Sequence, residues 1–327
     1  MAYSVEVMQR ARQRLADRKT DKESRYQENL EQAYQAQPRL KEIDMLLRAT
    51  MVQVAQVALS HGGDPTEMLE KIRQENLALQ QERKLLIATH FAPDYLDDSP
   101  VCSHCNGNGY IGATMCSCLA ALCREEQRKQ LGQLFNGTER FENFRLHYYP
   151  DRVDREYGVS FRTIMQKNLT YCRDYARNFS DQSRNLLFIG DTGLGKTFMA
   201  ACIANTVVDK GYSVAYESAG MLFRKLEKNR FTPTEQTQEE VDRIMGCDLL
   251  IIDDLGTEMP NAFVTAALYE LLNERLLSGK PMIISTNFRN DELSSRYSMQ
   301  IGSRLSGSFK GLTFVGEDIR VLKSRGV

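Results

Sequence analysis

Residues 190–197, GDTGLGKT, match the pattern G-x-x-x-x-G-K-[ST] at every fixed position. The segment follows an apolar run, NLLFIG at residues 185–190, and opens a helix-forming stretch at residues 196–211. Glycines in such a loop let backbone N–H groups face a chain of phosphates with no Cβ in the way, and the helix N-terminus adds partial positive charge. The sequence therefore predicts a phosphate-binding loop between a strand and a helix.

Every position of this loop is a predicted nucleotide contact. We expect Lys196 to reach the β- and γ-phosphates and the Thr197 hydroxyl to ligate Mg²⁺. The predicted contacts in the loop are Gly190, Asp191, Thr192, Gly193, Leu194, Gly195, Lys196, Thr197 and Phe198.

Short apolar runs alternate with helical segments from about residue 140 onward. The runs are NLLFIG at residues 185–190, SVAYES at 213–218, DLLIIDD at 248–254 and PMIISTN at 281–287. This alternation is typical of a parallel sheet covered by helices, so the expected fold class is α/β.

Two adjacent carboxylates end one of these predicted strands. Asp253 and Asp254 follow four apolar residues, and ligands of open α/β sheets bind at the carboxyl ends of the strands. We expect Asp253 to hold Mg²⁺ through water and Asp254 to polarise the attacking water. Taken alone, the pattern also fits a strand that runs into an acidic turn.

Two further residues have predicted roles in hydrolysis. Asn287 ends the strand at residues 281–287, where its amide would orient the nucleophilic water; the alternative is an asparagine that caps the helix starting near residue 290. Arg304 would stabilise charge in the transition state and can arrive from a neighbouring subunit; the alternative is a solvated arginine at a helix end.

Four cysteines lie within seventeen residues, CSHCNGNGYIGATMCSC at residues 102–118. Two close thiol pairs joined by a short glycine-containing loop suit tetrahedral Zn²⁺, and an iron-sulfur cluster or unligated thiols are the alternatives. The predicted ligands are Cys102, Cys105, Cys116 and Cys118, with His104 or Cys123 as substitutes for Cys118. The isolated Cys172, Cys202 and Cys247 are interpreted as small apolar residues.

Composition narrows the class of protein. The chain has 42% hydrophobic and 26% charged residues with a formal net charge of -1, so any nucleic-acid surface must be a local patch. Its first residues lack the apolar core of a secretory signal, and no apolar run approaches the roughly 20 residues that span a bilayer. We therefore expect a cytoplasmic protein with no membrane partner.

The order of motifs resembles that of AAA+ ATPases, and more narrowly that of the DnaC/DnaI-type replicative helicase loaders and their IstB-like relatives. The residues that carry this resemblance are ERFENFRLHYY, NLLFIGDTGLGKTFMAACIAN, LLIIDDLGTE, PMIISTNF and IGSRLSGSFKGLTFVGEDIR, which together cover roughly residues 138–327. We expect three regions in all. Residues 1–100 form a helical N-terminal region, because their start is rich in Gln, Glu, Lys, Arg, Leu and Ala; residues 101–135 form a zinc-binding module that completes a partner-binding domain. The resemblance implies an AAA+ ATPase domain at 136–327.

The same resemblance implies the cofactors ATP and Mg²⁺ beside Zn²⁺, and the partners of the protein. These are a DnaB-type hexameric helicase, single-stranded DNA, and further copies of the chain that receive the arginine finger. Arg320 occupies the place of a second sensor arginine that contacts the γ-phosphate. An IstB-like ATPase that assists a transposase, and a non-hydrolysing ATP switch, are the alternative functions.

One basic segment is a candidate for contacts with single-stranded DNA. Residues 220–231, GMLFRKLEKNRF, interleave aromatic and basic side chains suited to base stacking and phosphate binding. The alternative is a solvated basic helix with two phenylalanines in the core. The residues concerned are Phe223, Arg224, Lys225, Lys228, Arg230 and Phe231.

Overall fold

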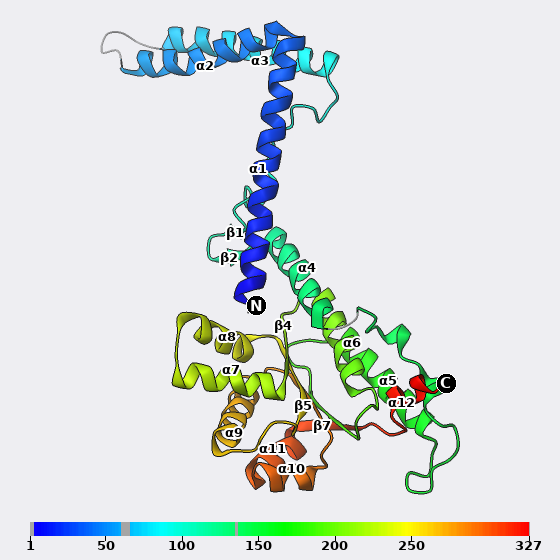
Figure 1. Cartoon of the computed structure of the whole chain (residues 1–327). Helices are drawn as coiled ribbons and strands as arrows, with labels where there is room; N and C mark the ends of the chain where they lie inside the picture. The colour runs from blue at the N-terminus through cyan, green and yellow to red at the C-terminus, as the bar shows by residue number, and fades with distance from the viewer. Residues whose placement is uncertain (1–2, 60–65, 135–136, 327) are drawn as a thin grey trace. The chain divides into compact units, whose positions relative to one another are not determined.

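The computed structural model describes residues 3–59, 66–134 and 137–326 (Figure 1). The chain forms two compact units: Gln13–Cys118, and a second unit made of Met1–Arg12 with Leu119–Val327. Residues 119–134 therefore belong to the same compact unit as residues 136–327, the predicted ATPase domain. The predicted boundaries at residues 100 and 135 separate regions by what they bind and not by compactness, so they stay a prediction.

The larger unit is built on one parallel sheet, as the sequence predicts. All neighbouring strands are parallel, in the order β4-β5-β6-β3-β7. The four predicted strands are present, and a fifth was missed. The strands are β3 (Asn185–Ile189), β4 (Val214–Ser218), β5 (Leu249–Leu255), β6 (Met282–Thr286) and β7 (Phe309–Thr313).

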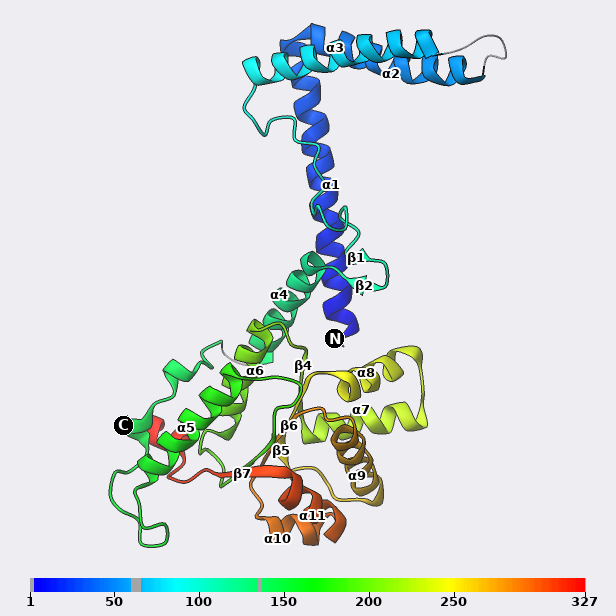
Figure 2. The same cartoon turned by 180° about the vertical axis from the view of Figure 1, so that it is seen from behind.

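Both faces of this sheet are buried under helices. Leu249 and Ile251 of β5 belong to one apolar core, and Leu250 and Ile252 belong to the other, because successive side chains of a strand point to opposite faces. Helices α5 (Phe161–Arg177) and α6 (Lys196–Asp209) pack on one core. Helices α7 (Ala219–Phe231), α8 (Glu235–Gly246), α9 (Ala262–Leu277) and α11 (Met299–Ser308) pack on the other (Figure 1, Figure 2).

Shorter elements complete this unit. The segment before α5 contains two single-turn 3-10 helices, η1 (Phe141–Asn143) and η2 (Leu146–Tyr148). Helix α4 (Ser117–Leu134) precedes them, α10 (Asn290–Arg296) follows β6, and α12 (Ile319–Ser324) closes the domain. Carboxyl ends of β3, β5 and β6 thus lie side by side, where the phosphate loop begins.

The smaller unit is mainly helical, which confirms the helical N-terminal region. It contains most of α1 (Val5–Ala36), then α2 (Pro38–Leu59) and α3 (Thr66–His90), and a small hairpin of β1 (Tyr110–Ile111) and β2 (Thr114–Met115). Helices α2 and α3 lie side by side and are joined by ion pairs of Arg39 with Glu82 (2.8 Å) and of Arg83 with Asp44 (2.7 Å). Across the described residues, no helix has the length and apolar character that a bilayer crossing requires.

Candidate functional site

The phosphate loop connects β3 to α6, as the sequence predicts. Its backbone is held open by glycines in conformations that other residues rarely adopt: φ is +78° at Gly193, where a Cβ would overlap the carboxyl group of Asp318. The N–H of Ile319 also donates to the Gly193 carbonyl (3.0 Å). The loop and the start of α12 are therefore packed backbone to backbone.

Lys196 is buried, with 4% of its surface exposed, at the first position of α6. Its Nζ donates to the carbonyl oxygens of Gly190 (2.6 Å) and Asp191 (2.7 Å) and to Oδ1 of Asn287 (2.7 Å). Burial lowers the pKa of this ammonium group, and the carboxylates of Asp254 and Asp253 act against that effect. The positive charge is thus directed into the loop.

Asn287 lies beside Lys196 and does not cap the following helix. Helix α10 is capped by Arg289, whose N–H donates to Glu292 Oε2 (2.6 Å). Because β6 lies between β5 and β3, the residue that follows β6 faces the phosphate loop. The structure therefore brings together the predicted loop lysine and the predicted water-orienting amide; the role in hydrolysis stays a prediction.

Asp253 is buried at the end of β5, with 6% of its surface exposed. Its Oδ2 accepts a hydrogen bond from the Tyr216 hydroxyl (2.8 Å), and its Oδ1 accepts one from the Ser285 hydroxyl. Tyr216 comes from β4 and Ser285 from β6, the two strands that flank β5. Sequence reasoning missed both residues, since only the strand order reveals which side chains meet Asp253.

Asp254 follows with a left-handed backbone, φ +56°, which is uncommon for a residue with a side chain. Its N–H donates to Ser285 Oγ (2.9 Å), so one serine hydroxyl contacts both aspartates. Burial raises the pKa of the Asp254 carboxyl, as does the charge of Asp253, while Lys196 and Arg320 oppose the rise. Both consecutive carboxylates therefore line the same cavity, although alternate residues of a regular strand point to opposite faces.

A cavity of about 540 Å³ in the larger unit is lined by residues 192–198 of the loop and by Asp253 and Asp254. Of the predicted site residues, Gly190, Asp191 and Asn287 are not among the described residues that line it. Arg320 of α12 lines it, which is compatible with its predicted place near the phosphates. Aromatic side chains form another part of the wall: the rings of Phe144 and Tyr149 stack at 5.7 Å, and the Tyr149 hydroxyl donates to the Leu194 carbonyl (2.9 Å). The aromatic residues of ERFENFRLHYY were a detectable signal for this wall, but the sequence assigns them no position.

Arg304 is not among the residues that line this cavity in the described part of the chain. It lies on α11, half-buried, with its guanidinium 4.3 Å from the centre of the Tyr269 ring. Its Nη2 donates to the Tyr269 hydroxyl (2.8 Å) and to Asn273 Oδ1 (3.2 Å), both on α9. The side chain is therefore held against α9, away from the nucleotide site of its own chain.

Some of the candidate DNA-binding residues of α7 are exposed, and others are buried or paired within the chain. Phe223 is 3% exposed and belongs to the core, whereas Phe231 is 68% exposed. Lys225 pairs with Glu217 (2.7 Å), so its charge is already matched within the chain. The expected interleaving of free aromatic and basic groups is thus incomplete, with the exposed part at the C-terminal end of α7.

The four predicted cysteine ligands form one cluster in the smaller unit. Their Sγ atoms all lie within 4.8 Å of one another, on both sides of the β1–β2 hairpin. His104 is exposed and Cys123 is buried on α4, and neither belongs to the group. Four cysteine thiols at this separation are the donor set that structural zinc prefers.

The pKa values of the cysteine thiols bear on whether this cluster can bind a cation. Backbone N–H groups of Cys105 and His104 lower the pKa of the Cys102 thiol, which favours a thiolate. Burial, together with the neighbouring thiols, raises the pKa of Cys118. All four groups could become thiolates together only beside a positive charge, which a bound divalent metal ion would supply.

Comparison with known proteins agrees with these features. Residues 150–300 match the profile of IstB-like ATP binding proteins. The replicative helicase loader DnaI of Bacillus subtilis strain 168 is 28% identical over 127 residues, which are 38% of this chain and 40% of DnaI. The replicative helicase loader DnaC of Escherichia coli K12 is 22% identical over 238 residues, 69% of this chain and 88% of DnaC.

Solved structures of the same two kinds of protein are among the neighbours. A crystal structure of the DnaC helicase loader has a TM-score of 0.45 at 20% identity and covers 54% of this chain and 98% of that one. A crystal structure of DnaI has a TM-score of 0.41 at 21% identity, covering 53% of this chain and 90% of that one.

Proposed function

We propose that this DnaC/DnaI-type AAA+ protein, whose residues 150–300 match the IstB-like ATP-binding family, places a DnaB-type hexameric helicase on single-stranded DNA under the control of ATP hydrolysis. The observation that supports the loader role most is the likeness that extends over 88% of the length of DnaC. Both the helicase and the DNA would be met in the cytoplasm.

The side chains in and beside the cavity support the proposal of ATP hydrolysis. Lys196 would bind the β- and γ-phosphates, Asn287 would orient the attacking water, and Asp254 would polarise it. Thr197 and Asp253 offer hard oxygen ligands, which fit Mg²⁺; the ion would neutralise charge on the phosphate oxygens. The proposal is supported by the lining of the cavity by Lys196, Thr197, Asp253 and Asp254, and by the hydrogen bond from Lys196 to Asn287 (2.7 Å).

Arg304 would act on the nucleotide of a neighbouring copy. It borders no part of its own cavity among the described residues, and Tyr269 and Asn273 hold its guanidinium at a surface of α9 and α11. A guanidinium supplied in this way stabilises the charge of the transition state. Hydrolysis would then require self-association.

The four cysteines would hold one structural Zn²⁺ ion. A cluster with only a two-stranded hairpin around it has little apolar core of its own, so the metal would supply much of its folding free energy. We assign this zinc-containing unit to helicase binding, in line with the resemblance to loaders with a zinc-binding N-terminal domain.

Subunit mixing tests the hydrolytic assignment. Asp254→Asn and Arg304→Ala should each lower the ATPase rate at least a hundredfold while ATP still binds. Arg304→Ala subunits keep an intact nucleotide site, and Lys196→Ala subunits keep an intact arginine, so a mixture of the two should recover activity that neither shows alone. No recovery would rule out an arginine in trans, and unchanged rates in both single variants would remove the assigned catalytic roles.

The family match also supports a second candidate, an ATPase that assists a transposase. A loader should bind single-stranded DNA and co-purify with a hexameric helicase, whereas a transposition helper should bind duplex DNA and a transposase. Full-length protein used as bait, with duplex and single-stranded DNA compared at the same salt concentration, separates the two. A chain that binds ATP without hydrolysing it would instead be a nucleotide switch.

A further inference from the structure

We propose that Tyr216 is a positioning residue of the nucleotide site: with Ser285, its hydroxyl fixes the carboxylate of Asp253 in the orientation that Mg²⁺ requires. This inference rests on the proposed ATP hydrolysis and adds to it a residue outside every sequence motif. Neither hydroxyl would touch the nucleotide; both would act through Asp253.

The two hydroxyl groups hold the carboxylate from opposite sides. Tyr216 on β4 donates to Oδ2 (2.8 Å), and Ser285 on β6 donates to Oδ1. Because each donor comes from a different flanking strand, the plane of the carboxylate cannot rotate without breaking one of the bonds. A carboxylate oxygen has two lone-pair sites, so each oxygen keeps one for a metal ion or its water.

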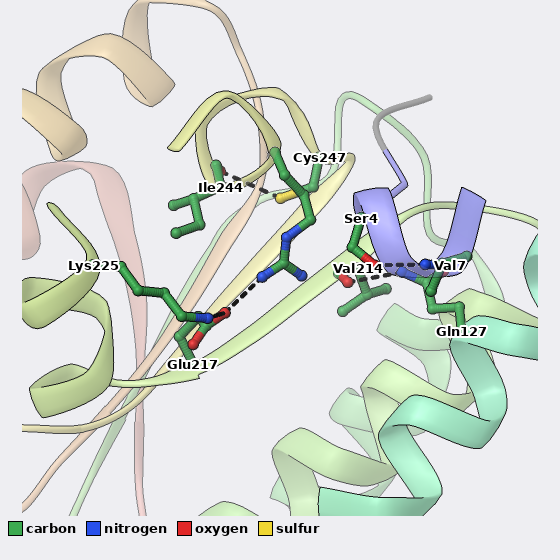
Figure 3. Close-up of polar contacts among 9 residues, drawn as sticks. Ser4, Val7, Gln127, Val214, Glu217, Lys225, Ile244 and Cys247 are labelled. Carbon is green, nitrogen blue, oxygen red and sulfur yellow. Dashed lines mark hydrogen bonds and ion pairs between the residues drawn. The ribbon is translucent and has the colours of Figure 1, made fainter. Parts of the chain in front are cut away.

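The position of Tyr216 depends on β4, which is an edge strand and has only β5 beside it. Side chains of three helices contact this strand, and Figure 3 labels Gln127 and Lys225 among them. Gln127 of α4 donates from Nε2 to the Val214 carbonyl (2.8 Å). At the next position after Tyr216, Glu217 Oε1 pairs with Lys225 of α7 (2.7 Å) and with Arg243 of α8 (2.7 Å).

Glu217 and Tyr216 point to opposite faces of the strand, since they are consecutive residues. Glu217 is 7% exposed and pairs with cationic side chains of α7 and α8, so loss of either partner would leave a buried charge poorly compensated. The tyrosine hydroxyl is therefore presented to Asp253 by backbone that is tied down on its other face. Similar outer contacts around metal ligands change metal affinity about 10- to 100-fold when they are removed.

Tyr216 also packs its ring on the core shared by α5 and α6, so the test must separate the hydroxyl from the ring. Tyr216→Phe keeps the ring and removes only the donor. Tyr175→Phe is the matched control, because Tyr175 packs on the same core and its buried hydroxyl has no hydrogen-bond partner among the described residues. Ser285→Ala removes the donor on the other side of Asp253, but it also removes the acceptor of the Asp254 N–H, so Tyr216→Phe is the cleaner of the two variants.

Binding of a fluorescent ATP analogue to the full-length protein is the first measurement, made in EDTA and across a Mg²⁺ titration. Tyr216→Phe should leave affinity in EDTA unchanged and raise the Mg²⁺ concentration for half-maximal tightening about tenfold. In steady-state hydrolysis at saturating Mg²⁺, kcat should fall more than KM rises. Ser285→Ala should change both readouts in the same direction, and Tyr175→Phe should change neither.

Three results are decisive. If the wild-type protein hydrolyses ATP and Tyr216→Phe has the same Mg²⁺ dependence, the positioning role is wrong and the proposed function stands. If Tyr216→Phe weakens binding equally in EDTA and in Mg²⁺, the hydroxyl only supports the fold, and the inference is again wrong. If the wild-type protein shows neither hydrolysis nor an effect of Mg²⁺ on binding, the proposed function itself fails.

Discussion

Gly193 gives the sharpest prediction about the contact between the phosphate loop and α12. In Gly193→Ala, the new Cβ would overlap the Asp318 carboxyl group in a backbone conformation, φ +78°, that L-residues avoid. Asp318 caps α12 by accepting from the Arg320 N–H (2.8 Å), and α12 carries Arg320 into the cavity. The overlap must therefore displace α12, the loop, or both.

The free-energy cost of Gly193→Ala has two parts. The left-handed conformation of an alanine costs about 1–2 kcal/mol, which should appear as lost stability. Displacing α12 breaks the bond from the Ile319 N–H to the Gly193 carbonyl (3.0 Å) and disturbs the cap at Asp318. At about 0.5–1.5 kcal/mol for each bond, the second part is about 1–3 kcal/mol, or a loss of about fivefold to a hundredfold in ATP affinity.

Gly279→Ala is the control, since Gly279 has a similar φ, +65°, with no atom within 4 Å of the position of its Cβ. We expect similar falls in Tm for both variants, and lower ATP affinity only for Gly193→Ala. Asp318→Ala removes the overlapping carboxyl group but also the cap of α12, so the double variant Gly193→Ala, Asp318→Ala should recover only the part of the affinity that depends on the bond between Ile319 and Gly193. Calorimetric ATP titration and thermal unfolding of the full-length protein measure both parts.

Two results would refute this reasoning. If Gly193→Ala binds ATP as tightly as the wild-type protein, contact between the loop and α12 has no part in nucleotide binding. If the double variant binds no better than Gly193→Ala, the lost affinity comes from the loop backbone alone and the overlap with Asp318 is irrelevant.

Three further predictions concern stability, hydrolysis and metal. The buried guanidinium of Arg275 donates to four backbone carbonyl groups at 2.9–3.2 Å, so Arg275→Met should lower the free energy of unfolding by about 3–5 kcal/mol, with a smaller loss for Arg275→Lys, measured by urea denaturation. Asn287→Ala should leave ATP affinity within about threefold and lower kcat about a hundredfold in steady-state assays, and an equal loss of affinity would contradict a role confined to the water. Metal analysis should find about one zinc ion per chain, and Cys105→Ser should lose the metal and helicase binding but retain ATP affinity; freshly prepared protein free of metal would disprove the assignment.

The phosphate loop, the strands around it and the cysteine cluster were predictable because their information is local. Consecutive residues specify the loop. The two thiol pairs are close in sequence, since only fourteen positions separate Cys102 from Cys116. Strand β7 was not predictable in this way: of FKGLT only Phe309 and Leu312 are buried, and the strand's remaining residues are polar or glycine. An edge strand with so few apolar residues resembles a loop in sequence.

Contacts between strands were beyond the sequence for a different reason. Tyr216 and Ser285 are separated by 69 positions and meet at Asp253 only because β5 lies between β4 and β6. No spacing rule connects residues that depend on strand order. The same holds for Arg304, whose partners on α9 follow from the packing of two helices and not from any motif.

The hydrogen bonds of Lys196 have a consequence for how a nucleotide enters. An ammonium group has three N–H donors, and all three already have acceptors: two loop carbonyls and the Asn287 amide. A phosphate oxygen can approach only by displacing one of them, so binding is an exchange of acceptors and not an addition. If Asn287 is the group displaced, arrival of a triphosphate would itself free the amide for water, and the proposed water-orienting group would become available only when there is a phosphate to attack.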